Sequence, residues 1–171
     1  CIRDRNYYNL VLSVSGLDKS ISISNYLNNF INSHSPQIEA RFRSSLPGVS
    51  DPETPKVVIE AILNETIRGA DAPYLLAGLI SHHENGKNAW EIIKLNWKDL
   101  LKVMPEWTSS RILDGLPSVY DEHIGKDIQD FIKLNPLPSA EKLMKQKFER
   151  LSANIKFKNS INSALKKAKF V

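Results

Sequence analysis

The chain has 171 residues, of which 42% are hydrophobic and 25% are charged, a composition that fits one folded domain and excludes a disordered chain. Its one cysteine, Cys1, excludes an internal disulfide, a thiolate zinc cluster and a C-x-x-C redox site, and the absence of an apolar run of roughly 18 residues excludes a membrane span. The net charge of +4 arises in residues 141–171, which hold nine basic and two acidic side chains, against a net of −3 in residues 1–140.

At the amino terminus, Cys1 stands where a primary translation product has Met, so we expect the chain to be a fragment of a larger protein. The single cysteine also favours a reducing, cytoplasmic location for that protein. Residues 7–14 are ambiguous, because their apolar side chains alternate with the period of a strand. A lone strand has nothing to pair with, so a helix that ends near Gly16 is the better prediction.

Apolar residues recur at helical spacing through the next part of the chain. They predict helices over residues 23–31, behind Ser35 and Pro36, and behind Pro55. Another helix is predicted to begin at Asp71, a natural N-cap that is followed by Pro73 in the first turn. The apolar residues on these faces are Ile23, Tyr26, Leu27, Phe30, Ile31, Val58, Ile59, Ile62, Leu63, Ala72, Leu75, Leu76, Leu79 and Ile80.

The clearest helical pattern follows a short loop. Residues 82–88, which include Gly86, are predicted to join two helices as a hairpin. One buried stripe is predicted behind them, from Trp90, Ile93, Trp97, Leu100, Leu101 and Met104. Two further faces follow, separated by residues 136–138, and Ser139 is the candidate cap of the last helix. Their apolar residues are Ile124, Ile128, Phe131, Ile132, Met144, Phe148, Leu151 and Ile155.

Short helices with short connections predict an all-α fold of stacked antiparallel helix pairs, forming a HEAT- or armadillo-like α-superhelix. The sequence has no repeat of fixed period, so this prediction depends on element lengths alone.

The sequence lacks the patterns that accompany catalysis. H-E-x-x-H, glycine-rich phosphate loops, G-x-S-x-G and paired cysteines have no match, so we predict no catalytic residue, metal ligand or cofactor in this chain. The nearest fragment is His82-His83-Glu84, and adjacent histidines in a turn indicate an exposed loop more than a metal site.

Arg68 and Asp71 are the candidate substrate-binding residues. An Arg and an Asp separated by Gly69 and Ala70 at a helix start could pair with each other or hold a ligand carboxylate. An Arg beside an N-cap Asp is more often local scaffolding of the turn. Trp90 and Trp97 lie on the predicted apolar stripe and are predicted to be core residues rather than the lining of a groove.

An ordered series of motifs over residues 66–167 resembles the C-terminal helical domain of the zinc aminopeptidases related to aminopeptidase N, including the endoplasmic-reticulum and insulin-regulated aminopeptidases. The Asp71-Ala72-Pro73-Tyr74-Leu75-Leu76 stretch is similar in particular to bacterial members. Two positions depart from the family pattern: Ala70 replaces Gln, and Phe157 stands where Trp is common. The motifs are Ile67-Arg68-Gly69-Ala70-Asp71, then Ala89-Trp90-Glu91-Ile92-Ile93-Lys94-Leu95-Asn96-Trp97, and Glu149-Arg150-Leu151-Ser152-Ala153-Asn154-Ile155-Lys156-Phe157.

The resemblance implies that residues 1–171 form a single non-catalytic domain, in which residues 51–171 are the family-like core and residues 1–50 match weakly. It also implies that the domain covers the active-site cavity of an upstream catalytic domain, its partner in the same chain. The zinc and its ligands would lie in that domain, and peptides would be the substrates. Arg68 would then be a possible contact for the distal part of a long peptide.

The residues themselves leave open two alternatives to a domain of a larger enzyme, namely a free-standing adaptor and a nucleic-acid-binding protein. A free-standing helical-repeat adaptor would bind a partner peptide along its concave surface and would have polar helices at both ends. A severed domain would expose apolar residues where another domain packs. Binding of nucleic acid through the basic terminal helix is the weaker alternative, because no aromatic stacking platform accompanies the lysines and a basic run is typical of a solvated face. We therefore expect neither a nucleic-acid nor a membrane partner.

Overall fold

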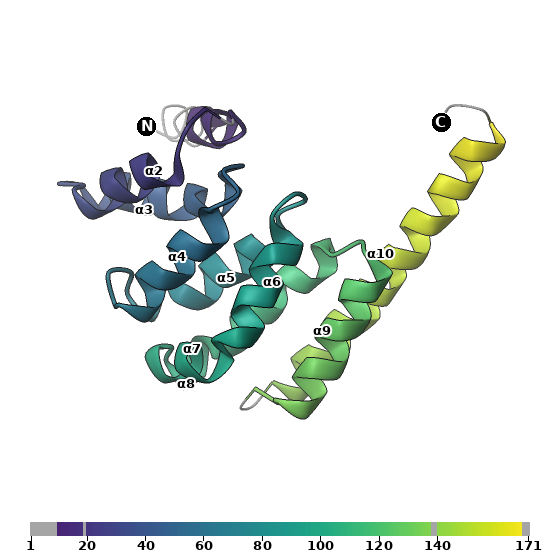
Figure 1. The fold of residues 1–171 in the computed structure, drawn as a ribbon. Coiled ribbons are helices and arrows are strands. Elements are labelled where there is room, and N and C mark those ends of the chain that lie inside the picture. Colours follow the sequence, from purple (N-terminus) through teal and green to yellow (C-terminus); the bar gives the residue numbers. More distant parts are fainter. Residues whose placement is uncertain (1–9, 19, 138–139, 169–171) are drawn as a thin grey trace.

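The computed structural model describes residues 10–18, 20–137 and 140–168, which form helices joined by short connections with no strand among them. Figure 1 shows the helices stacked one against the next, from the amino-terminal corner to the long last helix. The predicted all-α superhelical fold is confirmed, and its closer likeness to HEAT or armadillo repeats stays a prediction. The α-helices are α2 (Ile23–Ile31), α3 (Pro36–Ser45), α4 (Thr54–Leu63), α5 (Ala72–Ser81), α6 (Gly86–Leu95), α7 (Trp97–Val103), α8 (Glu106–Ser109), α9 (Glu122–Leu134) and α10 (Glu141–Lys167), and the 3-10 helices are η1 (Leu46–Gly48) and η2 (Ser110–Ser118).

The first described segment is helical over residues 10–16. This confirms a helix that ends near Gly16, while residues 7–9 of the ambiguous stretch lie outside the described residues. The segment is tied to α2 by Tyr26, whose hydroxyl donates a hydrogen bond of 2.7 Å to the Leu12 carbonyl. Ser22 caps α2, because its side chain accepts a hydrogen bond from the Ser24 amide.

Helix α5 lies at the centre of the packing. It makes its most extensive contacts with η2 and also packs against α4, α6 and η1. The two elements cross closely at Gly115, where a β-carbon would lie 2.3 Å from the Ala77 carbonyl oxygen. Residues 105–121 carried no sequence prediction of a helix, yet they supply four buried core side chains, Ile112, Leu113, Leu116 and Val119.

The predicted stripe behind the hairpin loop is buried except for Leu101, which is half-buried, but it does not lie on one continuous helix. The chain leaves the helical conformation at Asn96, between α6 and α7. The Asn96 side chain donates a hydrogen bond of 2.9 Å to the Ile92 carbonyl, so it competes with the backbone for that acceptor. The predicted buried stripe is therefore confirmed, and it is divided between α6 and α7 at this residue.

The two tryptophans of this stripe are core residues, as predicted: Trp90 is 1% exposed and Trp97 is 4% exposed. Both contact Phe131 of α9 edge to face, with ring centroids 5.4 Å apart in each case, a favourable aromatic arrangement. Trp107 on α8 is different, since 79% of it is exposed.

The hairpin loop is shorter than predicted, because α6 begins at Gly86 and only residues 82–85 join it to α5. His83 and Glu84 are exposed, but His82 is half-buried and Asn85 is buried. The side-chain amide nitrogen of Asn85 donates hydrogen bonds to the backbone carbonyls of Val49 and Asp51, which fixes the loop to the segment before α4.

The first part of α10 packs against η2 and α9 through Leu151 and Ile155. Its candidate cap, Ser139, lies outside the described residues. Figure 1 shows the carboxyl-terminal part of α10 extending beyond the other helices. Among the described residues, no helix combines the length and apolar run needed to cross a bilayer.

Candidate functional site

The turn before α5 brings the two predicted site residues together. The Arg68 Nε lies 3.5 Å from the Asp71 Oδ2. The turn is possible because residue 69 is glycine: a β-carbon there would lie 1.9 Å from the Val103 carbonyl oxygen at the end of α7. Close backbone packing at Gly69 therefore sets the position of both Arg68 and Asp71.

Asp71 is not the side-chain cap that the sequence suggested. It occupies the N-cap position of α5, but its backbone is helical and its side chain makes no capping hydrogen bond to the described first turn. The carboxylate instead binds two arginines, since its Oδ1 lies 2.9 Å from the Arg43 NH1 while its Oδ2 faces Arg68. The Asp71 carboxylate therefore connects α3 to this turn instead of capping α5.

Arg68 also pairs with Glu39 of α3, so four alternating charges link α3 to the turn before α5. Each partly exposed pair contributes about 0.2–1 kcal/mol, and a network holds its geometry better than a single pair. The arrangement is suited to clamping α3 against the turn. A ligand carboxylate that bound Arg43 or Arg68 would have to compete with Asp71 and Glu39.

Beside this network lies a groove of about 860 Å³. Its walls come from residues 13–17, from the end of α3 with η1, and from α5 with the loop that follows. Arg43 and Asp71 form a charged wall, and Val14, Leu17 and Tyr74 supply apolar surface. The volume is in the range of ligand pockets.

The structure treats the two predicted site residues differently. Asp71 lines the groove, whereas Arg68 is not among the described residues that line it. Sequence reasoning missed Arg43, which does line it. The sequence indicates the contact between Arg43 and Asp71 only weakly. Glu39 and Arg43 are four residues apart on one helix, which predicts that they share a face. Asp71 lies 28 residues after Arg43, and nothing in the sequence links it to that face.

His82, the first residue of the hairpin loop, also lines the groove. The His82 Nδ1 accepts a hydrogen bond of 3.1 Å from the backbone N–H of Asn85. The His82 Nδ1 must therefore be unprotonated. Burial, helped by the charge of His83, lowers the pKa of His82 below its ordinary value of 6.5. His82 is therefore favoured as a neutral hydrogen-bond acceptor in the folded chain.

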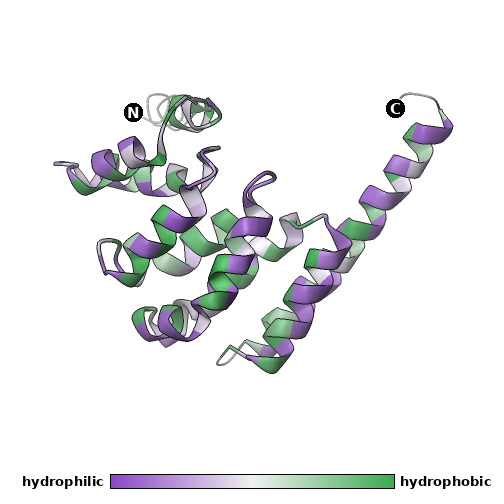
Figure 2. Cartoon of the chain, in the orientation of Figure 1, coloured by the Kyte–Doolittle hydropathy of each residue, from purple (hydrophilic) through white to green (hydrophobic). Residues whose placement is uncertain are grey.

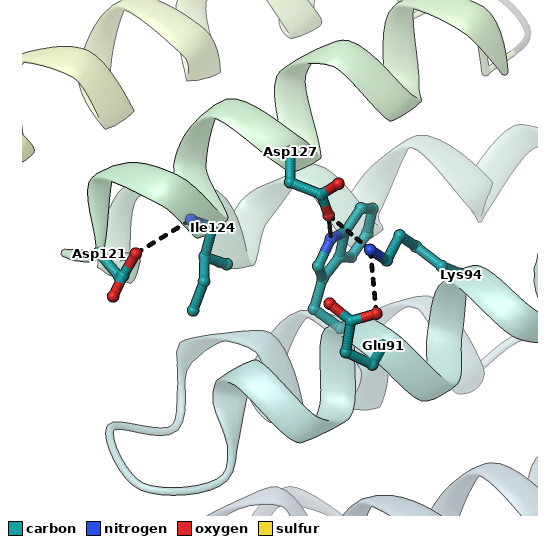
Figure 3. Close-up of polar contacts among 6 residues, drawn as sticks. Glu91, Lys94, Asp121, Ile124 and Asp127 are labelled. Atoms are coloured by element: carbon teal, nitrogen blue, oxygen red, sulfur yellow. Dashed lines mark hydrogen bonds and ion pairs between the residues drawn. The ribbon is translucent and has the colours of Figure 1, made fainter.

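A second polar cluster joins α6 to α9 (Figure 3). The Asp127 carboxylate accepts hydrogen bonds from the Trp90 indole at 2.6 Å and from the Lys94 ammonium at 2.7 Å. Lys94 also pairs with Glu91 at 3.0 Å. The hydrogen bond from Lys94, with a further one from Trp90, lowers the pKa of Asp127 below its ordinary value. This cluster fixes the packing of Trp90 and is structural in character.

The residues that the structure describes bring together no group of three or more His, Cys, Asp or Glu side chains with the geometry to hold a metal ion.

Comparison with known proteins adds an independent observation. Residues 6–153 match the family model described as "ERAP1-like C-terminal domain". The match begins before the sequence motifs at residue 66 and ends within α10. The chain is also 29% identical over 131 residues to a rice protein (Oryza sativa subsp. japonica) described as "Aminopeptidase M1-B", an alignment that covers 74% of this chain and 14% of the rice protein.

Proposed function

Because the chain belongs to the ERAP1-like C-terminal domain family, we propose that it is the non-catalytic C-terminal domain of a zinc aminopeptidase, an enzyme that releases amino-terminal residues from peptides. The observation that carries this proposal is the family match over residues 6–153. The chain spans 14% of the length of the rice relative. The activity, the substrates and the zinc therefore belong, in this proposal, to a larger cytoplasmic parent protein.

In the proposed enzyme, this domain covers the active-site cavity of an upstream catalytic domain and restricts access to peptides. The zinc would supply a Lewis acid and an activated water in that catalytic domain. The described residues of this chain would act by enclosing the cavity and by contacting the distal part of a long peptide. Enclosure of this kind excludes water and gates turnover.

The groove beside Asp71 is the proposed contact for that distal part. Because Asp71 already neutralises Arg43, the groove is better suited to an apolar peptide side chain than to a free carboxylate. Tyr74 is 54% exposed and Leu17 is 57% exposed, and both line the groove. Burying them against a peptide would contribute about 25 cal/mol for each Å² of apolar surface removed from water.

Exposed apolar residues support packing against another domain rather than a free-standing adaptor. The first described helix exposes Leu10, Val11 and Val14, by 61%, 42% and 56% respectively. An adaptor would have polar helices at its ends.

The test is a comparison of substrate lengths in the intact parent protein. We expect Tyr74→Ser to lower kcat/KM about threefold to tenfold for a nonapeptide, corresponding to roughly 1 kcal/mol, and to leave an amino-acid anilide unaffected. Arg68→Ala should also lower kcat/KM for the nonapeptide, because it removes the pairs with Glu39 and Asp71 that hold α3 against the turn before α5. Lys102→Ala is the matched control, because that side chain is 74% exposed and pairs with Asp99 on α7. If the nonapeptide and the anilide are equally unaffected by Tyr74→Ser and Arg68→Ala, the peptide-binding role is wrong.

A further inference from the structure

The buried face of α10 ends at Ile155. Up to that residue, the apolar side chains of α10 pack toward the rest of the domain. Three, four, seven and eleven residues further on, the same helical face would continue, but all four positions are polar and exposed. They are Lys158, Asn159, Asn162 and Lys166. Beyond Ile155, α10 therefore has no apolar side chains on the face that packs against the other helices of this domain.

A second apolar stripe begins at once on another side of the helix. At 100° per residue, Phe157 points about 200° away from Ile155, and Ile161 and Leu165 follow it at four-residue spacing. Phe157 is 67% exposed, Ile161 41% and Leu165 37%. Ala164 and Ala168 lie within the same arc of about 100°. Figure 2 shows hydrophobic and hydrophilic bands alternating along this projecting part of α10.

The projecting part of α10 lacks the packing that stabilises the rest of the helix. Every described residue of 156–168 is exposed, and the segment is about 20 Å long at 1.5 Å per residue. Helices of this length are marginal in water unless an apolar face is packed. Asn159, Ser160, Asn162 and Ser163 are weak helix formers, so propensity does not replace that packing.

The charge around the stripe indicates the chemistry of the partner. At 100° per residue, Lys158 and Lys167 lie on either side of the stripe, about 60° and 120° from its centre, and the sequence has no acidic residue after Glu149. Two copies of this helix would bring lysines of like charge together, which disfavours self-association. An apolar groove bordered by carboxylates complements the stripe in both shape and charge.

We propose that residues 156–168 dock, through Phe157, Ile161 and Leu165, into an apolar groove bordered by carboxylates. This groove would lie in the part of the parent polypeptide that precedes residue 1 of this chain. This inference rests on the proposed function, in which the chain is one domain of a longer enzyme; the rice relative is a protein of which this chain spans 14%. The family match ends at residue 153, so the docking surface lies beyond the region described by the family model.

The test places a photo-crosslinking residue in the intact parent protein. In Ile161→benzoylphenylalanine, irradiation is expected to give an intramolecular crosslink to an acidic segment of the preceding part of the chain, identified by mass spectrometry. Asn159→benzoylphenylalanine is the matched control, because residue 159 lies about 160° away from the stripe centre, and we expect no such crosslink from it. Amides of residues 157–165 should exchange at least tenfold more slowly than in the parent with Phe157, Ile161 and Leu165 each changed to serine.

Several outcomes would overturn the docking: a crosslink between two copies, binding to anionic phosphatidylserine vesicles without an intramolecular crosslink, or no difference in exchange between the two proteins. Aminopeptidase activity is measured on the same samples. An intramolecular crosslink without activity would leave the docking in place and remove the proposed function. Activity without an intramolecular crosslink would remove the docking alone.

Discussion

The indole nitrogen of Trp90 lies 2.6 Å from a carboxylate oxygen of Asp127, so a buried tryptophan of α6 is held by a residue of α9. The same carboxylate binds Lys94. This relationship joins two helices whose apolar faces also meet at Phe131. The position of Trp90 is thus determined by ring packing and by one charged acceptor.

Removing the Asp127 carboxylate should destabilise the domain. Asp127→Ala leaves the Trp90 N–H without its acceptor and Lys94 without one of its two carboxylates. We expect a loss of about 1–2 kcal/mol in the free energy of unfolding, measured by urea denaturation. Asp130→Ala is the control, because Asp130 is on the same helix and pairs with exposed Lys133 at 3.7 Å. Equal losses in the two variants would contradict the role of Asp127.

The stabilisation that the Asp127 carboxylate provides should decrease at low pH. The hydrogen bond from Lys94, assisted by that from Trp90, lowers the pKa of Asp127 in the folded state. A carboxyl with a lowered folded pKa contributes stability above its unfolded pKa of about 3.9 and loses it as pH falls through the folded value. The difference in stability between the unsubstituted chain and Asp127→Ala should therefore narrow below about pH 4. A constant difference from pH 6 to pH 3 would be inconsistent with this.

Gly69 should tolerate no side chain. In Gly69→Ala the new β-carbon would meet the Val103 carbonyl oxygen, a backbone atom that cannot move independently. We expect a loss of about 2–4 kcal/mol, typical of severe overpacking, from thermal or urea unfolding. Gly48→Ala is the control, because a β-carbon there meets nothing within 4 Å. Comparable stability of the two variants would show that the turn does not pack as described.

His82 should titrate below the ordinary histidine range. Burial, then the charge of His83, lowers its folded pKa, and its Nδ1 already accepts the Asn85 hydrogen bond. Between the folded pKa and the unfolded value of about 6.5, the unfolded chain binds more protons, so stability falls as pH decreases through this window. Nuclear magnetic resonance of the imidazole protons measures the pKa directly. A value at or above 6.5 would contradict the neutral acceptor role.

Much of the fold could be predicted because helical periodicity is a local property. The faces around Ile59, Leu76 and Ile128 were identified from spacing alone, and all three residues are buried. The break at Asn96 was not predicted, because it depends on one side chain competing for a backbone carbonyl. Helix η2 was missed because Gly115 and Pro117 interrupt the apolar pattern.

The candidate site was predicted only in part, for a related reason. Arg68 and Asp71 are close in sequence, and their pairing could be expected from three-residue spacing. Arg43 reaches Asp71 from α3, a contact that depends on how helices stack and leaves no local pattern. The groove likewise combines residues from three distant segments, such as Val14, Arg43 and Tyr74.

The most direct test of the central claim is the release of amino-terminal residues from a nonapeptide by the intact parent protein and by the 171-residue chain alone. Our account predicts that the intact parent releases amino-terminal residues one at a time and that the isolated chain releases none. A parent without this activity, or an isolated chain that has it, would contradict the proposal that the chain is the non-catalytic C-terminal domain of an aminopeptidase.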